Sequence, residues 1–100
     1  MSLLSIIVAE EKDRIKKMIS GYEQELVTLP KGSLVAKKIK NKQYFYLQFR
    51  KGKKIISSYI GGKADKVDEL RELINRRKHV EVMLKALKIE YAQAEKITGE

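Results

Sequence analysis

The sequence predicts an α+β fold in the order α-β-β-β-α, with a three-stranded antiparallel sheet and two long helices packed as a helical hairpin. Apolar residues recur at steps of three and four near both ends of the chain, whereas apolar and polar residues alternate in the middle. Gly and Pro separate these segments. One hundred residues correspond to a single domain, 1–100, with a helix over 2–28, a sheet over 33–60 and a helix over 65–97.

The first helix is predicted from an apolar stripe that is continuous except around Glu11. The stripe contains Leu4, Ile7/Val8, Ile15, Met18/Ile19, Tyr22, Leu26 and Leu29. Glu10 and Arg14 lie four residues apart on the predicted polar side, where they would form an ion pair. Pro30 and Gly32 end the helix, because the residue before a proline is disfavoured in the α region.

The central strand, residues 43–50, has two distinct faces. One face carries Phe45, Leu47 and Phe49, and the other carries Tyr44, Tyr46, Gln48 and Arg50. The phenyl and leucyl side chains have no polar group to satisfy, so we expect them, with Ile56 and Ile60, to face the helices. A two-residue Lys51-Gly52 loop would place Leu47 opposite Ile56 and Tyr44 opposite Tyr59.

The first strand, about 34–40, reaches the central strand through Asn41-Lys42. A two-residue and a three-residue loop would place Lys38 on opposite faces of the sheet, so this register stays open.

The second helix follows Gly61-Gly62, with Asp65 as its predicted N-cap. Its stripe consists of Leu70, Leu73/Ile74, Arg77, Val80, Leu84, Leu87, Tyr91 and Ala94. We expect Arg77 to lay its aliphatic stem on the core and reach outward. Because this helix is longer than a three-stranded sheet, it needs a further partner. The first helix and a second copy of the chain are the two alternatives.

The charge is strongly segregated along the sequence. The chain carries 22 Lys/Arg against 13 Asp/Glu, a net charge of +9. No acidic residue lies between Glu25 and Asp65, a stretch that holds ten Lys/Arg; the remaining chain has twelve Lys/Arg against thirteen acids. The whole positive excess therefore belongs to the predicted sheet.

No pattern of catalytic or ligand-holding residues is present in the sequence. There is no Cys, and the single His79 lies beside Arg76, Arg77 and Lys78, where a surface role is the ordinary one. Gly61-Gly62-Lys63 lacks the upstream Gly and the Ser/Thr of a phosphate-binding loop. We therefore expect no enzyme, no catalytic residue, no metal site and no cofactor. The short apolar run at residues 3–9 indicates no signal peptide or membrane span, and the lack of Cys favours a cytoplasmic location.

The basic, tyrosine-bearing sheet is the predicted binding site, because cations neutralise phosphates and aromatic rings stack with bases. The alternative reading is structural, since strands favour aromatic residues and lysines protect sheet edges from aggregation. The predicted binding residues are Lys37, Lys38, Lys40, Lys42, Tyr44, Tyr46, Gln48, Arg50, Lys51, Lys53, Lys54, Tyr59 and Lys63.

Three segments resemble a widespread group of small, uncharacterised prokaryotic and mobile-element proteins. They are LPKGSL (29–34), YFYLQFRKGKK (44–54) and SSYIGG (57–62), followed by the VDELRELINRRK helix. The resemblance covers most of residues 29–80 and implies the same topology. A similar Tyr-x-Leu…Arg-x-Gly-Lys hairpin occurs at the start of some transposases, which is a hint towards DNA. Small basic proteins of phages and mobile elements also include inhibitors of host CRISPR nucleases.

We therefore expect a small, non-enzymatic nucleic-acid-binding protein whose partner is DNA, RNA or a nucleoprotein complex. The alternative is a phage or mobile-element inhibitor of a CRISPR nuclease (anti-CRISPR), which would bind the effector or its guide and target nucleic-acid site. A dimerising scaffold whose charge serves solubility is a third hypothesis. A homodimer through the long helices is compatible with each of them.

Overall fold

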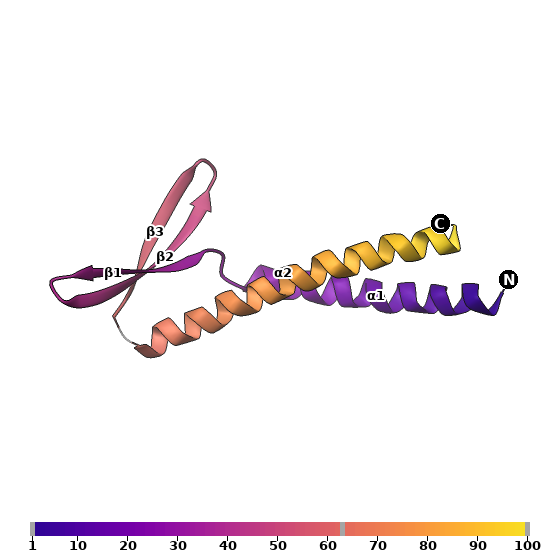
Figure 1. Cartoon of the computed structure of the whole chain (residues 1–100), viewed down its shortest axis with the longest axis horizontal. Helices are drawn as coiled ribbons and strands as arrows, with labels where there is room; N and C mark the ends of the chain where they lie inside the picture. Colours follow the sequence, from indigo (N-terminus) through magenta and orange to yellow (C-terminus); the bar gives the residue numbers. More distant parts are fainter. Residues whose placement is uncertain (1, 63, 100) are drawn as a thin grey trace. The chain divides into compact units, whose positions relative to one another are not determined.

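The computed structural model describes residues 2–62 and 64–99 and confirms the α-β-β-β-α order (Figure 1). Its elements are α1 (Leu3–Thr28), β1 (Ser33–Ile39), β2 (Lys42–Lys51), β3 (Lys54–Gly61) and α2 (Ala64–Thr98). The strands form one antiparallel sheet in the order β1-β2-β3. The chain divides into a helical unit, residues 1–28 and 79–100, and a sheet unit, residues 29–78.

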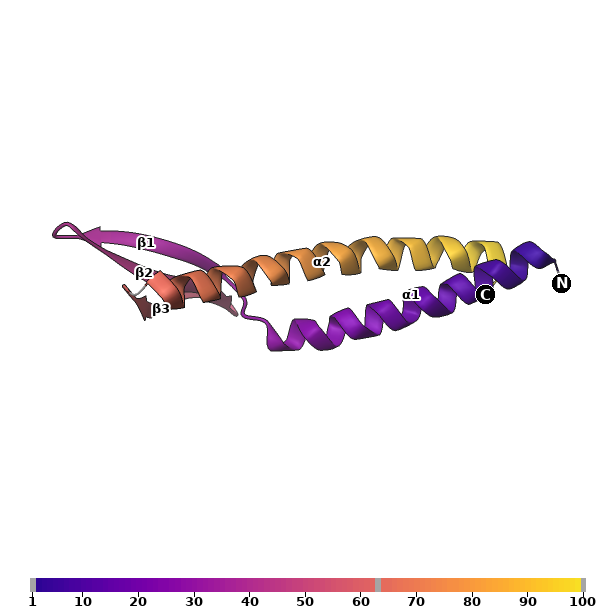
Figure 2. The same ribbon diagram turned by 90° about the horizontal axis from the view of Figure 1, so that it is seen from below.

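In the helical unit, α1 and the second half of α2 lie side by side and run antiparallel (Figures 1 and 2). Two contacts define their alignment. Lys88 Nζ lies 3.7 Å from Glu23 Oε1, and Lys12 Nζ donates a 3.2 Å hydrogen bond to Thr98 Oγ1. The predicted helical hairpin is thus confirmed, and the partner of this part of α2 is α1 of the same chain.

The buried residues of α2 follow the predicted stripe. Buried apolar residues of the two helices in this unit are Ile15, Val80, Leu84, Leu87 and Ala94, and Val80 is fully inaccessible. From Val80 to Thr98 the stripe advances by four and three residues in turn, which is the spacing of helices that pack as a coiled coil. Leu73, predicted on the stripe, is 46% exposed, whereas its neighbour Ile74 is buried.

The buried stripe of α1 differs from the predicted one at its start. Leu4 and Ile7 are 65% and 52% exposed, and the side facing α2 carries Ser5, Val8 and Lys12 instead. The sequence pattern was ambiguous here because Ile7 and Val8 are adjacent and both apolar. Packing against α2 covers the residues that precede Ile15 at steps of three and four, which are Lys12, Val8 and Ser5.

Lys12 is the buried charged residue of the helical unit, with only 7% of its surface exposed. Its ammonium lies 5.4 Å from the centroid of the Tyr91 ring and donates to Thr98. A cation over an aromatic face gains electrostatic attraction, so part of the cost of burial is offset. No feature of the sequence marked this position, because a lysine in a helix ordinarily extends its ammonium into water.

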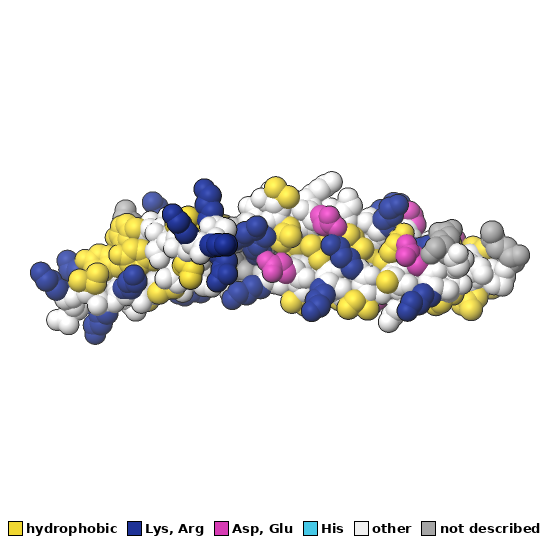
Figure 3. Space-filling model, turned by 90° about the horizontal axis from the view of Figure 1, so that it is seen from above, with side chains coloured by type: hydrophobic (Ala, Val, Ile, Leu, Met, Phe, Trp, Pro, Cys, Tyr) yellow, Lys and Arg dark blue, Asp and Glu magenta, His cyan; other side chains and the backbone are white. Residues whose placement is uncertain are grey.

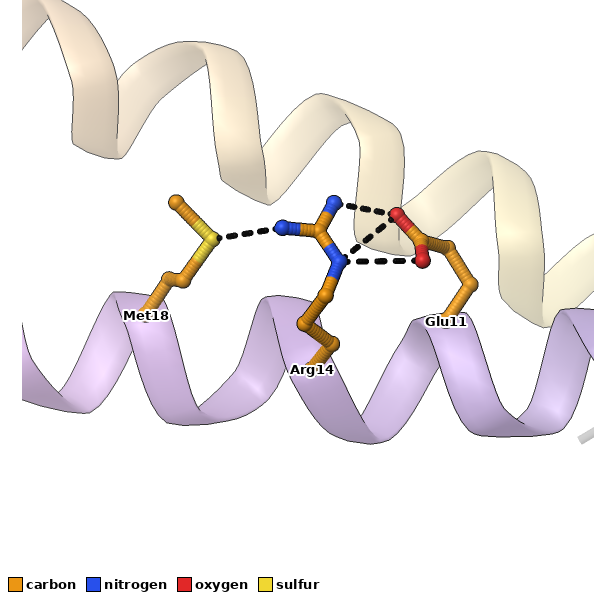
Figure 4. A network of polar contacts seen from close by, with 3 residues as sticks. All are labelled: Glu11, Arg14 and Met18. Carbon is orange, nitrogen blue, oxygen red and sulfur yellow. Dashed lines mark hydrogen bonds and ion pairs between the residues drawn. The ribbon is translucent and has the colours of Figure 1, made fainter.

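Ion pairs between nearby residues lie along α1, and in Figure 4 the side chains of Glu11, Arg14 and Met18 extend from α1 towards α2. Arg14 Nε donates to both carboxylate oxygens of Glu11 at 3.1 and 3.0 Å, and Arg14 Nη1 contacts Met18 Sδ at 3.1 Å. The sequence predicted Glu10 as the partner of Arg14, but Arg14 pairs with Glu11 instead. The hydrogen bonds from Arg14 hold the pKa of Glu11 below its ordinary value. Both groups are exposed, so this pair contributes little to stability.

In the sheet unit, the apolar face of the sheet is covered only in part. Leu34, Phe45, Leu47, Phe49, Ile56 and Ile60 are all half-buried, and none of the residues in the three strands, all of which the structure describes, is fully buried. The buried residues of this unit are Leu29, Val67 and Ile74. Val67 and Phe45 line the same hollow, so the first turns of α2 lie beside this end of β2.

Arg77 links the start of the sheet unit to α2. Its Nη1 donates a 2.8 Å hydrogen bond to the carbonyl oxygen of Leu29, just before Pro30. The side chain is half-buried, and its guanidinium, which we expected to reach outward, instead contacts the backbone of the buried residue Leu29.

The register of the β2–β3 hairpin differs from the predicted one by two residues. The loop is Gly52-Lys53 rather than Lys51-Gly52, so Leu47 lies opposite Ser58 and Tyr46 lies opposite Tyr59. A β-bulge between Phe45 and Tyr46 shifts the pairing further along the strands. A two-residue shift changes partners but leaves every side chain on its predicted face, because the side-chain period of a strand is two.

The β1–β2 loop settles the register that the sequence left open. Lys40 and Asn41 form the loop with φ values of 49° and 65°, and Ile39 pairs with Lys42. Positive φ at both loop residues is the signature of a type I′ turn, whose twist matches that of the flanking strands. Lys38 lies opposite Gln43, so it is on the Phe/Leu face.

Two glycines should respond to Ala substitution in opposite ways. At Gly32 the backbone has φ of 121°, and an added Cβ would lie 2.3 Å from the carbonyl oxygen of Gln48. Gly32→Ala should therefore lower the free energy of unfolding by at least about 1–3 kcal/mol. Gly21 lies within α1 with no atom within 4 Å of the added Cβ, so Gly21→Ala should raise stability by about 0.5–1 kcal/mol. Urea denaturation measures both, and similar effects of the two substitutions would contradict the assignment of Gly32 to a close approach.

The buried Lys12 gives a second prediction. Lys12→Met keeps the stem beside Tyr91 and removes the buried charge, so its free energy of unfolding should stay within about 1 kcal/mol of the wild-type value. Lys12→Ala also removes the stem and should cost about 2 kcal/mol. Thermal and urea unfolding of the two variants test this. If Lys12→Met unfolds as easily as Lys12→Ala, the ammonium itself holds the helix ends together.

Candidate functional site

The register assigns every strand residue to one of two faces, because directly opposed residues and alternate residues of a strand share a face. We call the side that bears the tyrosines the tyrosine face. It comprises Ser33, Val35, Lys37, Ile39, Lys42, Tyr44, Tyr46, Gln48, Arg50, Ile55, Ser57 and Tyr59.

Three tyrosines gather at the centre of this face. The Tyr59 ring centroid lies 5.4 Å from that of Tyr46 and 6.2 Å from that of Tyr44, and the ring planes are tilted by 55° and 47°. These are favourable separations for aromatic pairs. The sequence correctly placed the three residues on one face, although it paired Tyr59 with Tyr44 instead of Tyr46.

Lys37 is the cation nearest to the tyrosines. Its Nζ lies 4.9 Å from the Tyr46 ring centroid, and in the ladder Lys37 is opposite Tyr44. The ring thereby holds the ammonium beside the cluster instead of leaving it free in solvent. Lys42 and Arg50 are on the same face, nearer to the two ends of β2.

The predicted cations do not all share this face. Lys37, Lys42 and Arg50 are on it, together with Gln48. Lys38, Lys51 and Lys54 are on the Phe/Leu face, and Lys40 and Lys53 lie in the two hairpin loops. Lys63 lies outside the described residues. The structure thus brings together three cations, three tyrosines and one amide, with loop lysines at both hairpin ends.

A shallow hollow of about 300 Å³ opens among the tyrosines, lined by Ile39, Tyr44, Tyr46 and Tyr59. Tyr59 is 58% exposed and Ile39 is 49% exposed, so its apolar wall is accessible to solvent. Sequence reasoning missed Ile39, because its face depends on the β1–β2 register. The Asn in the loop was the one local signal, since Asn adopts positive φ more readily than most residues.

A second hollow in the sheet unit has a mixed lining. It measures about 630 Å³ and is bounded by Lys42, Gln43, Tyr44, Phe45, Gly62, Ala64, Val67, Asp68 and Arg71. Arg71 Nη1 lies 3.6 Å from Asp68 Oδ1, so two of the three charges in its wall compensate each other, and Lys42 is the third. Tyr44 lines both hollows, but only the tyrosine-face hollow is free of acidic residues.

Charge divides between the two units. The sheet unit contains fifteen Lys/Arg against four Asp/Glu, a balance of +11, whereas the helical unit contains seven against nine, a balance of −2. On the face drawn in Figure 3, the strands display Lys and Arg, and the visible Asp and Glu lie over the helices. The positive charge of the chain is therefore concentrated in the sheet unit.

Other kinds of site find no support in the described part of the chain. Within residues 2–62 and 64–99, no group of three or more His, Cys, Asp or Glu is placed to hold a metal ion. No helix in the same ranges has the length and apolar character to cross a membrane. His79 is exposed on α2, as expected for a surface residue.

Comparison with known proteins assigns the chain to a family whose function is not known. Neither a curated protein nor a solved structure matches the chain. A family model described as "Domain of unknown function (DUF6788)" matches residues 8–72, which include most of α1, the whole sheet and the first turns of α2. Because the match covers more than half of the chain, the chain belongs to the DUF6788 family.

Proposed function

We propose that this chain is a non-enzymatic nucleic-acid-binding protein that uses the tyrosine face of its sheet. The observation that carries the proposal is a tyrosine cluster, half-buried at Tyr44 and Tyr46 and exposed at Tyr59, on strands that bear no carboxylate. Phosphates require cations, and nucleobases or sugars offer flat surfaces that pack against aromatic rings. The tyrosine face supplies both within a single sheet.

The arrangement of charges supports nucleic acid over a compact small anion. Lys37, Lys42 and Arg50 are spread along the strands and do not converge on one point. At about 3.3 Å per residue, the eight-residue separation of Lys42 and Arg50 spans roughly 26 Å of β2. A row of cations at this scale fits a polyanion, whereas a single phosphate ion would leave most of the row unpaired.

The helical unit has no comparable role in this proposal, because its charge is slightly negative. We still predict that the chain forms a homodimer through its helices. We also predict a cytoplasmic location, because the sequence contains no Cys. The resemblance to mobile-element proteins also stays a prediction. In the alternative function, as a CRISPR-nuclease inhibitor, the same basic face would contact a nucleoprotein instead of free nucleic acid.

The first test of the proposal is the salt dependence of binding. Each neutralised phosphate contributes about −0.7 to −0.9 to the log–log slope of affinity against salt, so four to six contacts give a slope of roughly −3 to −5. A fluorescence titration of labelled DNA and RNA oligonucleotides at three salt concentrations measures this slope. Arg50→Ala should flatten it by about one unit. Lys16→Ala, which removes an exposed cation of the helical unit, is the matched control and should leave the slope unchanged.

Absence of binding to single-stranded DNA, duplex DNA and RNA at about 50 mM salt would refute the proposed function. Such a result would favour the protein-targeting alternative.

The second test separates the two faces of β2 with adjacent residues. Leu47 belongs to the Phe/Leu face and Tyr46 to the tyrosine face, and both are half-buried. Leu47→Ala should cost about 2 kcal/mol of unfolding free energy, at the low end for a core truncation because Leu47 is not fully covered. Tyr46→Ala should cost less stability and weaken nucleic-acid binding by about 1–3 kcal/mol.

Thermal unfolding and the same fluorescence titration, applied to both variants, provide the measurements. If Leu47→Ala reduced affinity in a fully folded protein while Tyr46→Ala had no effect on it, the binding face would be the opposite one.

A further inference from the structure

The hollow at the centre of the tyrosine face has walls that phosphate binding does not use. Ile39 and the three tyrosine rings line this shallow, open hollow of about 300 Å³, and no Lys or Arg is part of its lining. The ammonium of Lys37 lies beside it, over the Tyr46 ring. Ile39 and Tyr59 expose about half or more of their surface here, although apolar surface of this kind is costly to leave in water. An apolar hollow within a basic face indicates a ligand that is itself apolar in part and anionic in part.

The tilt between the tyrosine rings determines the shape of the chemical group that fits into the hollow. Ring planes inclined by 47° and 55° form the walls of a notch, not one continuous flat platform. A planar group can lie against one ring while its edge meets another ring or the Ile39 side chain. The four residues come from all three strands, so the ladder of hydrogen bonds holds the notch in shape.

A cationic ligand is the obvious competitor, because aromatic cages bind methylated ammonium groups. The charges of this face argue against it. Lys37, Lys42 and Arg50 are on the tyrosine face, the strands contain no acidic residue, and the ammonium of Lys37 already lies over the Tyr46 ring. A second cation would be repelled, whereas an anion attached to a flat group would be attracted.

We propose that the hollow receives an unpaired nucleobase, so that the chain binds single-stranded nucleic acid in preference to duplex. This inference rests on the proposed function and names its substrate class. In a duplex the base faces are stacked inside, and only phosphates, sugars and groove edges reach a protein surface. In a single strand the base faces are available for stacking on aromatic side chains.

Lys37 completes the arrangement. When a base occupies the hollow, the phosphate of the same nucleotide lies at the edge of the hollow. The Lys37 ammonium is held at this edge, next to Tyr46. The hollow therefore pairs one stacking site with one cation, which is the minimal unit of single-strand recognition. Rings and an aliphatic side chain stack with any base, so little discrimination among the four bases follows from this site.

The test compares a single strand with a hairpin duplex of equal length and composition, so that both carry the same number of phosphates. Affinities of the full chain are measured by fluorescence anisotropy at one salt concentration. The single strand should bind at least about fivefold more tightly, because it alone gains a stacking contact worth roughly 5- to 150-fold in affinity. A 2-aminopurine placed in the single strand should lose fluorescence on binding as its ring stacks.

Tyr59→Ala is the informative variant, since the side chain is 58% exposed and its loss should not unfold the sheet. It should weaken single-strand binding by about 5- to 150-fold, abolish the 2-aminopurine signal and change duplex binding by no more than about twofold. Tyr59→Phe keeps the ring and should behave as wild type. Val82→Ala, at a 66% exposed position of α2 in the helical unit, is the matched control and should have no effect.

The possible failures are distinguishable. Equal affinity for strand and hairpin, with Tyr59→Ala affecting both alike or neither, overturns the assignment of the hollow and leaves the proposed function standing. No binding of either oligonucleotide overturns the proposed function together with the inference. Circular dichroism of each variant before titration ensures that a lost signal reports on binding.

Discussion

Both units of this chain depend on the buried stripe of α2. Its first part, with Val67 and Ile74, belongs to the sheet unit, and its second part, from Val80 to Ala94, packs with α1. A three-stranded sheet of this size and a single helix each lack enough apolar surface to fold alone. The step from Arg77 to Val80 is the place where the stripe changes partner, and the boundary between the units, at Lys78 and His79, falls within it.

Arg77 combines an aliphatic stem with a charged hydrogen-bond donor, and both are used at this position. An apolar residue there would leave the carbonyl oxygen of Leu29 without the charge-assisted donor it has now, at 2.8 Å from Nη1. The aliphatic stem continues the stripe, while the guanidinium ties the segment before Pro30 to the helix. A single long side chain thus joins the first residues of the sheet unit to the part of α2 that belongs to the same unit.

The charges of the strands contribute little to this architecture. Ten Lys/Arg without an intervening acid repel one another, and most are exposed, so their mutual repulsion is screened but not removed. The strands could pair equally well with mixed charges. The exposed tyrosines add apolar surface to the side of the sheet opposite the Phe/Leu face. The proposed binding role would account for the cations and tyrosines that occur together on this surface, which packing alone does not.

The sequence by itself determined the order of the elements, their bounds to within one or two residues and the two faces of β2. These features depend on local periodicity and on Pro and Gly, which act within a few residues. The alternation of Phe45 and Leu47 with Tyr44 and Tyr46 therefore predicted the tyrosine face even though the predicted β2–β3 pairing was two residues out of register.

Only the tertiary structure decided which residues complete the site and the core. The φ values at Lys40 and Asn41 set the β1–β2 register, which placed Lys37 beside Tyr46, brought Ile39 into the hollow and left Lys38 on the other face. The packing of α1 against α2 likewise turned Lys12 inward and Leu4 outward. In each case two arrangements satisfied the same local pattern. The choice between them came from a neighbour distant in sequence, which periodicity along one element does not reveal.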